Sequence, residues 1–305
     1  YQDNQFQETF LQYAREAKNL YDLAYMMGYK PKVTGVALVD VDFYQTVPEL
    51  AGAPDYNYAL LISENSQISS PSGIQFLVED PVDFDTSSSQ DPTTVSIYQE
   101  TAGVVDFFLL KKTRKAISAT INTTTISAGS TPTEFFTTDI SAPNLIGILD
   151  IVDADGNIWY EVPHLGQEMV YDSIKNTNPN DPNFYSDNTN TPYLLKLKQI
   201  QRRFATRFTN PTTLQIQFGS GTTNDADEEV TPNADNVGLG LPFEKNKLTA
   251  AYSPQNFMFT DTYGIAPTGQ LTIRYLTGGG ASANVRAGNL TTLSNSVVNF
   301  QVPNI

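Results

Sequence analysis

The sequence predicts a mainly β protein with an N-terminal α-helix, a multi-domain β-sandwich or hairpin-rich architecture that is α+β overall. Three observations predict this fold class. Only 17% of the 305 residues are charged, and Thr, Asn, Ser and Gln supply most of the polarity. The 16 Tyr and 17 Phe suit twisted sheets joined by many turns. Helical spacing of apolar residues is confined to the first 27 residues, and a two-residue alternation begins near residue 36.

Residues 1–35 are expected to form a helical segment, with Gly28 and Pro31 as its C-terminal stop. Leu11, Leu20 and Leu23 widen the apolar face, so the helix is expected to bury more than one surface. Two interpretations stay open: the helix docks on its own domain, or it joins a bundle with helices of other chains. The candidate bundle face recurs at three- and four-residue spacing and consists of Phe6, Phe10, Tyr13, Ala17, Tyr21 and Ala24.

A first β domain is expected at 36–116. In Val39–Phe43 apolar and acidic residues alternate, which is typical of a half-buried strand. Further strands are expected at Ala59–Ile62, Ile74–Val78 and Val104–Leu110, separated by turns rich in Ser, Pro and Asp.

A second β domain is expected at 117–217. Asp155-Gly156-Asn157 between two apolar runs predicts a hairpin. The polar stretch 176–192 is too long for a plain connection and is expected to be an exposed loop that carries contacts. The expected strands are Ile117–Ile121, Phe135–Phe136, Ile146–Val152 and Ile158–Val162.

Residues 218–305 are expected to hold a solvated acidic loop, Gly219–Asn236, followed by return strands at Phe257–Thr260 and Leu271–Leu276. The run Gly278-Gly279-Gly280 predicts a sharp turn. A further C-terminal region is expected beyond Ile305, because no final element is obvious there.

The amino-acid composition disfavours several kinds of binding partner. A net charge of −15 disfavours nucleic acid, whose binding depends on Lys and Arg, and it disfavours an anionic membrane surface as well. No apolar run reaches the length of a membrane span. The chain has no cysteine, which excludes disulfides, thiolate nucleophiles and Cys–zinc sites.

No catalytic, cofactor-binding or metal-binding residue is assigned, and the chain is not expected to be an enzyme. His164 is the one histidine, and no nucleophile motif lies near it. Residues 153–157 resemble a calcium loop, but Gly156 falls at the wrong place and the flanks are strand-like. A carboxylate-based glycosidase stays open only because 33 acidic residues offer many pairs.

Two basic clusters stand out against the acidic background. Each is either a solvated edge or a surface that registers against an acidic patch of another subunit, such as a second copy of the chain. Arg202, Arg203 and Arg207 are the candidate interface residues of the second cluster. The clusters are Lys111, Lys112, Arg114 and Lys115, and then Lys196, Lys198, Arg202, Arg203 and Arg207.

Four stretches, in order along nearly the whole chain, together resemble the baseplate wedge subunit of T4-like contractile-tailed bacteriophages, within the baseplate J-like group. They are Asn19–Tyr21 with Met27–Lys32, Ile68–Ser70 with Ser72–Phe76, Arg202–Arg207 with Leu214–Gly221, and Leu271–Tyr275 with Gly278–Gly280 and Asn284–Val285.

The resemblance implies a scaffold protein of the virion, made in the host cytoplasm, without substrate, metal or nucleotide. Two copies would pair within each wedge, and their N-terminal helices would join a core bundle with another wedge protein. Six wedges would close a ring around the central hub, and the ring would widen on contraction. The alternative is a receptor-binding, adhesin or capsid-like viral protein, in which Trp159 or Tyr185 would be the first candidates to stack on a sugar.

Overall fold

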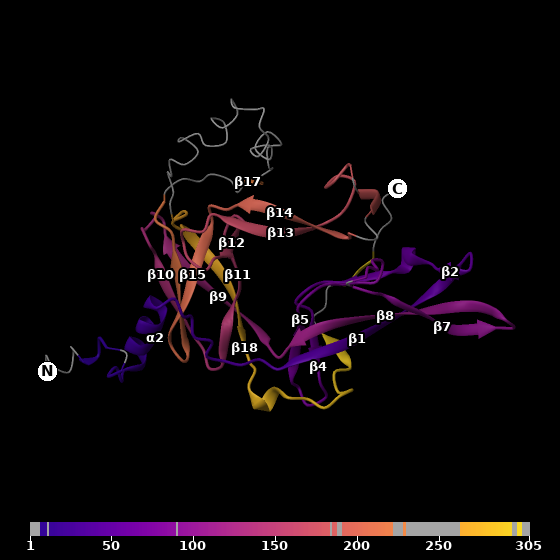
Figure 1. Ribbon diagram of the computed structural model, residues 1–305, viewed down its shortest axis with the longest axis horizontal. Helices are drawn as coiled ribbons and strands as arrows, with labels where there is room; N and C mark the ends of the chain where they lie inside the picture. The colour runs from indigo at the N-terminus through magenta and orange to yellow at the C-terminus, as the bar shows by residue number, and fades with distance from the viewer. Residues whose placement is uncertain are drawn as a thin grey trace, which may run out of the picture. The chain divides into compact units, whose positions relative to one another are not determined.

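The computed structural model describes residues 7–10, 12–89, 91–183, 185–187, 191–221, 228–229, 263–294 and 298–300. They form a mainly β protein with an α-helix near the N-terminus, as predicted (Figure 1). Phe6, Leu11, the expected strand Phe257–Thr260 and most of the expected acidic loop lie outside the described residues.

The N-terminal helix α2 spans Ala17–Met26 and is shorter than predicted, because Glu8–Phe10 and Gln12–Tyr13 form turns and a bend. The Glu8 carboxylate folds back there and accepts hydrogen bonds from the backbone N–H of Arg15 and Glu16. The predicted C-terminal stop is confirmed. Gly28 has a φ of 81°, and its N–H and that of Tyr29 bond the carbonyls of Tyr25 and Ala24, the paired bonds of a Schellman cap.

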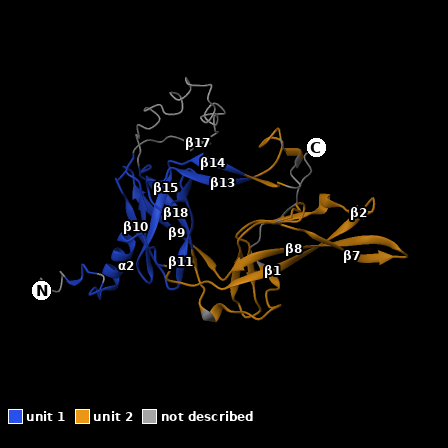
Figure 2. Ribbon diagram, viewed as in Figure 1, with its two compact units in different colours: residues 1–31, 123–174, 195–275 blue, residues 32–122, 175–194, 276–305 orange. Residues whose placement is uncertain are grey.

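The chain divides into two compact units (Figure 2). Unit 1 comprises 1–31, 123–174 and 195–275, and unit 2 comprises 32–122, 175–194 and 276–305. The predicted domains follow one another along the sequence, whereas these units take alternating segments of it. The predicted boundary near 116/117 lies a few residues from the passage at 122/123, and residues 218–305 are shared between both units.

Unit 1 is built on a sheet with strand order β10-β16-β15-β12-β11-β18-β9. Its core includes Leu145, Trp159, Phe204, Phe218 and Ile273. The strands are β9 (Thr120–Gly129), β10 (Thr137–Ser141), β11 (Leu145–Asp153), β12 (Ile158–Glu161), β15 (Arg203–Asn210), β16 (Thr213–Phe218) and β18 (Gly269–Thr277).

Two predictions for unit 1 have opposite outcomes. The hairpin at Gly156 is confirmed, since β11 and β12 pair antiparallel and Asp153 Oδ1 accepts the N–H of Asp155 and Asn157 across the turn. The predicted strand Phe135–Phe136 is wrong. Phe135 has a φ of 52°, which a strand residue does not adopt, and its N–H bonds the carbonyl of Gly219.

Unit 2 contains a sheet of order β19-β4-β5-β8-β1-β2, with β7 also paired to β8. A smaller sheet has the order β20-β3-β6. The strands are β1 (Leu38–Leu50), β2 (Ala53–Pro54), β3 (Leu60–Ile62), β4 (Gln67–Ser69), β5 (Gln75–Val78), β6 (Val82–Asp83), β7 (Thr94–Thr101), β8 (Val104–Ile117), β19 (Thr292–Ser294) and β20 (Val298–Phe300).

Strand β1 shows the predicted alternation, because Val39, Val41 and Phe43 are half-buried while Asp40 and Asp42 are exposed. The strands expected within 59–62, 74–78 and 104–110 are present as β3, β5 and the first half of β8. The strand expected at Ile117–Ile121 is divided between the end of β8 and the start of β9, because the chain bends at 118–119.

A third group of strands has the order β13-β14-β17, with β13 at Met169–Lys175, β14 at Tyr193–Gln199 and β17 at Glu228–Glu229. Glu228 and Glu229, expected in a solvated loop, pair instead with Gln199 and Lys198. The loop between β13 and β14 is exposed over most of its described length, and Asn176 closes its base by hydrogen bonds to Thr191 and Pro192. Short 3-10 turns lie at Tyr56–Tyr58, Tyr185–Asp187 and Ala281–Ala283.

Candidate interaction surfaces

The predicted bundle face is only partly free. Helix α2 packs against β15 of its own unit, and Tyr21 and Ala24 are half-buried. Ala17, Phe10 and Tyr13 are exposed, the last two by 48% and 60%. The helix therefore docks on its own unit through part of the predicted face, while Phe10 and Tyr13 remain exposed in the segment before it, so the two interpretations of the face are compatible.

The structure corrects the prediction for Arg203, which is completely buried. Its guanidinium donates hydrogen bonds to the carbonyls of Leu165 at 2.7 Å and Ile200 at 2.6 Å, and so fastens two loops to the start of β15. A buried cation needs such partners because desolvation of its charge is costly. Arg203 is therefore a structural residue and is not placed to meet another subunit.

Arg202 and Arg207 also interact within unit 1. Arg202 Nε lies 3.7 Å from the Asp153 carboxylate, and the Arg202 side chain is 14% exposed. Arg207 donates to Gln215 Oε1 at 2.6 and 2.8 Å, and its guanidinium lies over the ring of Tyr25 on α2, 5.8 Å from the centroid. Arg207 thus secures α2 on β15. Its side chain is still 37% exposed, so the predicted contact of Arg207 with another subunit stays a prediction.

The first basic cluster alternates between interior and surface, because its residues follow one another along β8. Lys111 faces outward and pairs with Asp42 at 2.9 Å. Lys112 faces inward, its side chain is inaccessible, and Asp91 lies 2.9 Å from its ammonium. Arg114 binds the same carboxylate through two hydrogen bonds of 2.6 and 2.7 Å. This pair of cations is therefore no solvated edge: it ties the segment around Asp91 to β8.

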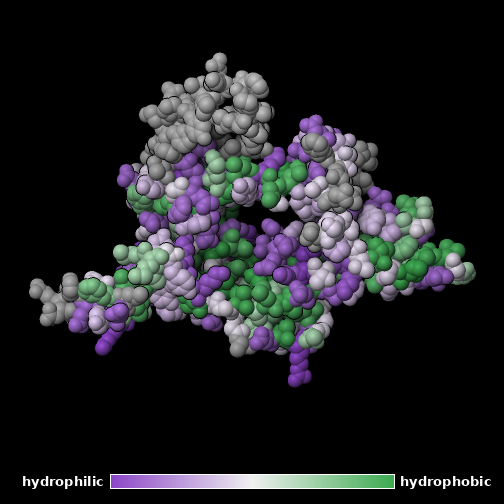
Figure 3. All heavy atoms as spheres, in the orientation of Figure 1, coloured by the Kyte–Doolittle hydropathy of each residue, from purple (hydrophilic) through white to green (hydrophobic). Residues whose placement is uncertain are grey.

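The most exposed apolar strand is β7, of which every residue is exposed. It pairs with β8, and β8 pairs with β1 on its other side, which gives a three-stranded ribbon. Figure 3 shows hydrophobic residues gathered at the end of this ribbon, where β2 and β7 lie in Figure 1. The large apolar side chains exposed along these strands are Leu38 at the far end of β1 and then Tyr44, Leu50, Val95, Ile97, Tyr98, Val104 and Phe107.

The sequence contains a signal for this ribbon that the predictions missed. Ala102 and Gly103 join β7 to β8 with φ values of 52° and 83°. Two positive φ values define the tight turn that matches the twist of a hairpin. Ala51 and Gly52 join β1 to β2 in the same conformation, with φ values of 55° and 87°. Because alanine rarely occupies this position, Ala-Gly is a weaker turn signal than Asn-Gly or Asp-Gly.

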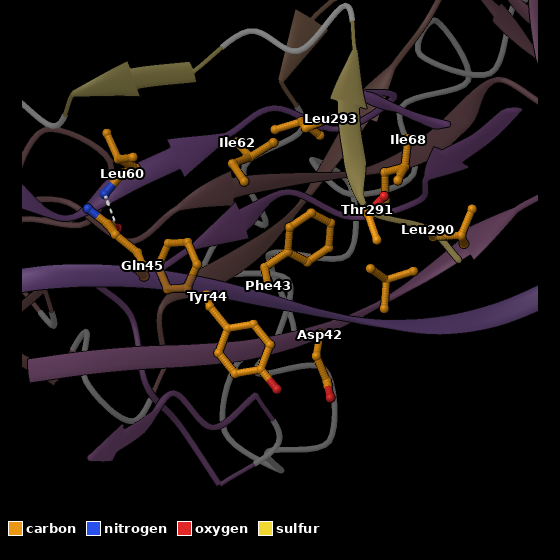
Figure 4. Close-up of a pocket in the computed structure, with 12 residues that line it drawn as sticks. Asp42, Phe43, Tyr44, Gln45, Leu60, Ile62, Ile68, Leu290, Thr291 and Leu293 are labelled. Carbon is orange, nitrogen blue, oxygen red and sulfur yellow. Dashed lines mark hydrogen bonds between the residues drawn. The ribbon is translucent and has the colours of Figure 1, made fainter. Parts of the chain in front are cut away.

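A cavity of about 370 Å³ opens into the core of unit 2. Phe43 is directed towards Ile62, Ile68 and Leu290, whereas Asp42 and Tyr44 point from the other face of β1 (Figure 4). Gln45 links β1 to the segment Tyr58–Leu60 beside the cavity. Its side-chain amide donates a hydrogen bond to the Tyr58 carbonyl at 2.6 Å and accepts one from the Leu60 N–H at 2.9 Å. The lining is mostly apolar and suits a hydrophobic side chain.

Metal-binding clusters are absent from the described part of the chain. Three or more His, Asp and Glu residues in metal-binding reach of one another do not occur among those residues. His164 is exposed, in a turn closed by a hydrogen bond from the Gln167 N–H to its carbonyl. In the same residues, no helix has the length and apolar character that crossing a bilayer requires.

The two aromatic residues considered for sugar stacking differ in their surroundings. Trp159 is 3% exposed and packs edge-on against Phe218 at 5.2 Å, so it is a core residue. Tyr185 is 42% exposed in the loop between β13 and β14. A binding face that depends on Trp159 would require the core of unit 1 to open.

Comparison with known proteins adds no relative: the chain matches no protein-family model and no curated protein.

Proposed function

We propose that the chain is a structural baseplate wedge component of a contractile phage tail and belongs to the virion. A second copy pairs with it in the wedge, and the N-terminal segment joins a helical core bundle with other wedge proteins. The resulting ring surrounds the central hub and rearranges when the sheath contracts. The four ordered stretches that resemble this family support the proposal. It assigns no catalytic residue, cofactor, metal, nucleic acid or membrane.

The observation that carries the proposal is the apolar surface of the N-terminal segment. No residue of α2 is buried, although the helix lies against β15. Large apolar side chains are exposed at each of its two ends, and apolar side chains that gather at a surface in this way mark an interaction site. Their exposed fractions run from about half to four fifths: Phe10 48%, Tyr13 60%, Met26 81%, Met27 69% and Tyr29 65%.

The proposal includes sandwich-like packing of unit 1. Strands β9 and β10 are the two ends of its strand order, yet Ala128 on β9 and Ile140 on β10 belong to one core cluster. Phe218, on the interior strand β16, belongs to the same cluster, and its ring centroid lies 6.0 Å from the ring centroids of Phe136 and Phe204. A sheet whose ends share one core must curl over it, which supports two facing layers.

The proposal is tested by making the N-terminal surface acidic. Tyr13→Asp combined with Met26→Asp should weaken co-purification with the neighbouring baseplate proteins of the same phage by at least about tenfold, because charges would enter an apolar interface. Urea unfolding should stay unchanged, since both side chains are mostly exposed. Tyr171→Asp is the control, because Tyr171 is 75% exposed on β13. Normal assembly by the double variant would refute the bundle role.

A further inference from the structure

Strand β7 pairs with β8 alone among the described residues, so one of its edges faces no other described strand. An edge strand presents a row of unpaired backbone N–H and C=O groups, which is a template for one more strand. Register shifts near Ile97, Gln99 and Glu100 distort the end of β7 next to its turn, so the regular part of the edge is Thr94–Ile97.

The side chains of the ribbon show on which face an added strand would be covered. Residues directly opposite one another in an antiparallel ladder point to the same face. Val47, Phe108 and Ile97 form one such row across β1, β8 and β7. Leu110 and Val95 lie opposite each other in the next row.

Burial decreases steeply along both rows towards β7. Val47 and Leu110 are inaccessible, whereas Val95 is 41% and Ile97 is 56% exposed. The apolar face that belongs to the core of unit 2 thus continues onto an edge strand without cover. One added strand, with apolar residues at alternate positions, would extend that face and shield both side chains.

The charges near β7 indicate which kind of polypeptide could add a strand to its edge. Glu100 is exposed and Asp106 is half-exposed at the turn end of β7 and β8, and neither forms an ion pair within the described residues. At the opposite end of the ladder Lys111, which pairs with Thr94, is already neutralised by Asp42. A second copy of the chain would bring a net charge of −15 to this acidic end. A segment with a basic residue complements it.

We propose that the free edge of β7 accepts an extended segment of a different polypeptide as an added strand, with apolar side chains over Val95 and Ile97 and a Lys or Arg near Glu100. The main-chain hydrogen bonds supply affinity, and the alternating side chains supply selectivity. The inference goes beyond the proposed function, because it concerns unit 2 and requires neither α2 nor a bundle.

Synthetic peptides test the proposal on the full chain. The probe alternates valine and threonine over six residues and ends in two lysines. It should shift the NMR signals of Thr94–Ile97 and slow exchange of their outward amides. Alternate N-methylation of the probe should weaken binding at least about tenfold, since the added ladder loses its hydrogen bonds. Replacement of the lysines by glutamates should weaken binding and reverse its salt dependence, because added salt would then screen a repulsion.

Protein variants complete the test. Ile97→Lys should weaken binding of the lysine probe at least about tenfold, because it places a charge on the face to be covered. Tyr44→Lys should bind as the parent protein does, since Tyr44 is similarly exposed, at 58%, on a strand that does not border β7. Unchanged thermal unfolding verifies that both variants are folded.

Three results with the probe would overturn the proposal. They are equal binding of the N-methylated probe, binding that Ile97→Lys leaves unaltered, and no binding at millimolar probe. Concentration-dependent dimerisation of the protein through β7 would show that a second copy is the occupant, and would equally overturn it. The Tyr13→Asp, Met26→Asp variant should bind the probe normally, which separates failure of the bundle from failure of this edge.

Discussion

Asp91 shows how a single carboxylate can hold a segment against a strand. It accepts two hydrogen bonds from Arg114 and lies 2.9 Å from the ammonium of Lys112. The ammonium also donates to the carbonyls of Asp83 and Thr86 at 2.8 and 2.7 Å. Burial lowers the pKa of Lys112, and Asp91 opposes that effect. Burial would raise the pKa of Asp91, but hydrogen bonds from Arg114 and Lys112 outweigh it and lower that pKa below 3.8.

Asp91→Asn should reduce local stability around β8 by about 2 kcal/mol at neutral pH, because Lys112 and Arg114 would lose a charged acceptor. The loss should shrink in acid. Since folding lowers the pKa of Asp91, its contribution is present above pH 3.8 and disappears as the pH falls through the lower, folded value. Hydrogen exchange of β8 amides between pH 3 and pH 7 measures both effects.

Asp42→Asn is the matched control for this prediction. Asp42 pairs with Lys111 on the same strand pair, but both side chains are about 40% exposed. An exposed ion pair contributes about 0–1 kcal/mol, so this variant should change exchange little. An equal loss of local stability in the two variants would show that burial does not make the Asp91 ion pair more stabilising than the Asp42 ion pair.

Local sequence patterns predicted an element correctly where it depended only on the backbone conformation of a turn residue or on the burial of one face of a strand. The alternation in Val39–Phe43, the hairpin at Gly156 and the helix stop at Gly28 are present as predicted. The helix start failed because Glu8, eight residues before Glu16, folds back to it, a contact that periodicity does not reveal. The prediction for Arg203 failed for a similar reason: one of its two carbonyl partners, Leu165, lies 38 residues earlier in the sequence.

The hairpin β7–β8 gives a prediction at the same scale. Ala102 adopts a φ of 52°, which costs an alanine about 1 kcal/mol and which asparagine tolerates better. Ala102→Asn should therefore slow amide exchange in the hairpin about two- to fivefold, equivalent to about 0.5–1 kcal/mol. Ala51→Asn should do the same for β1–β2. Ala53→Asn, at an exposed position in the strand β2, should bring no gain.

The hydrophobic cores of the two units differ in how far apart their residues lie in the sequence. All buried members of the unit 2 core, from Val47 to Leu110, lie in one continuous stretch. The unit 1 core runs from Ala128 to Ile273, and it depends on β18, which lies between β11 and β9. Composition could predict a β-rich molecule, but no local signal pairs Leu271 with strands formed more than a hundred residues earlier.

This difference predicts how fragments behave. Fragment 117–217, which the sequence delimits as a domain, should not unfold cooperatively, because without β18 its sheet is divided and the core loses Phe218, Ile265, Leu271 and Ile273. Fragment 123–275 restores these residues and should show one cooperative urea transition. Trp159 is the only tryptophan and is buried in this core, so its fluorescence reports the transition directly. A cooperative transition in fragment 117–217 would show that β18 is dispensable and that the core of unit 1 is already complete without it.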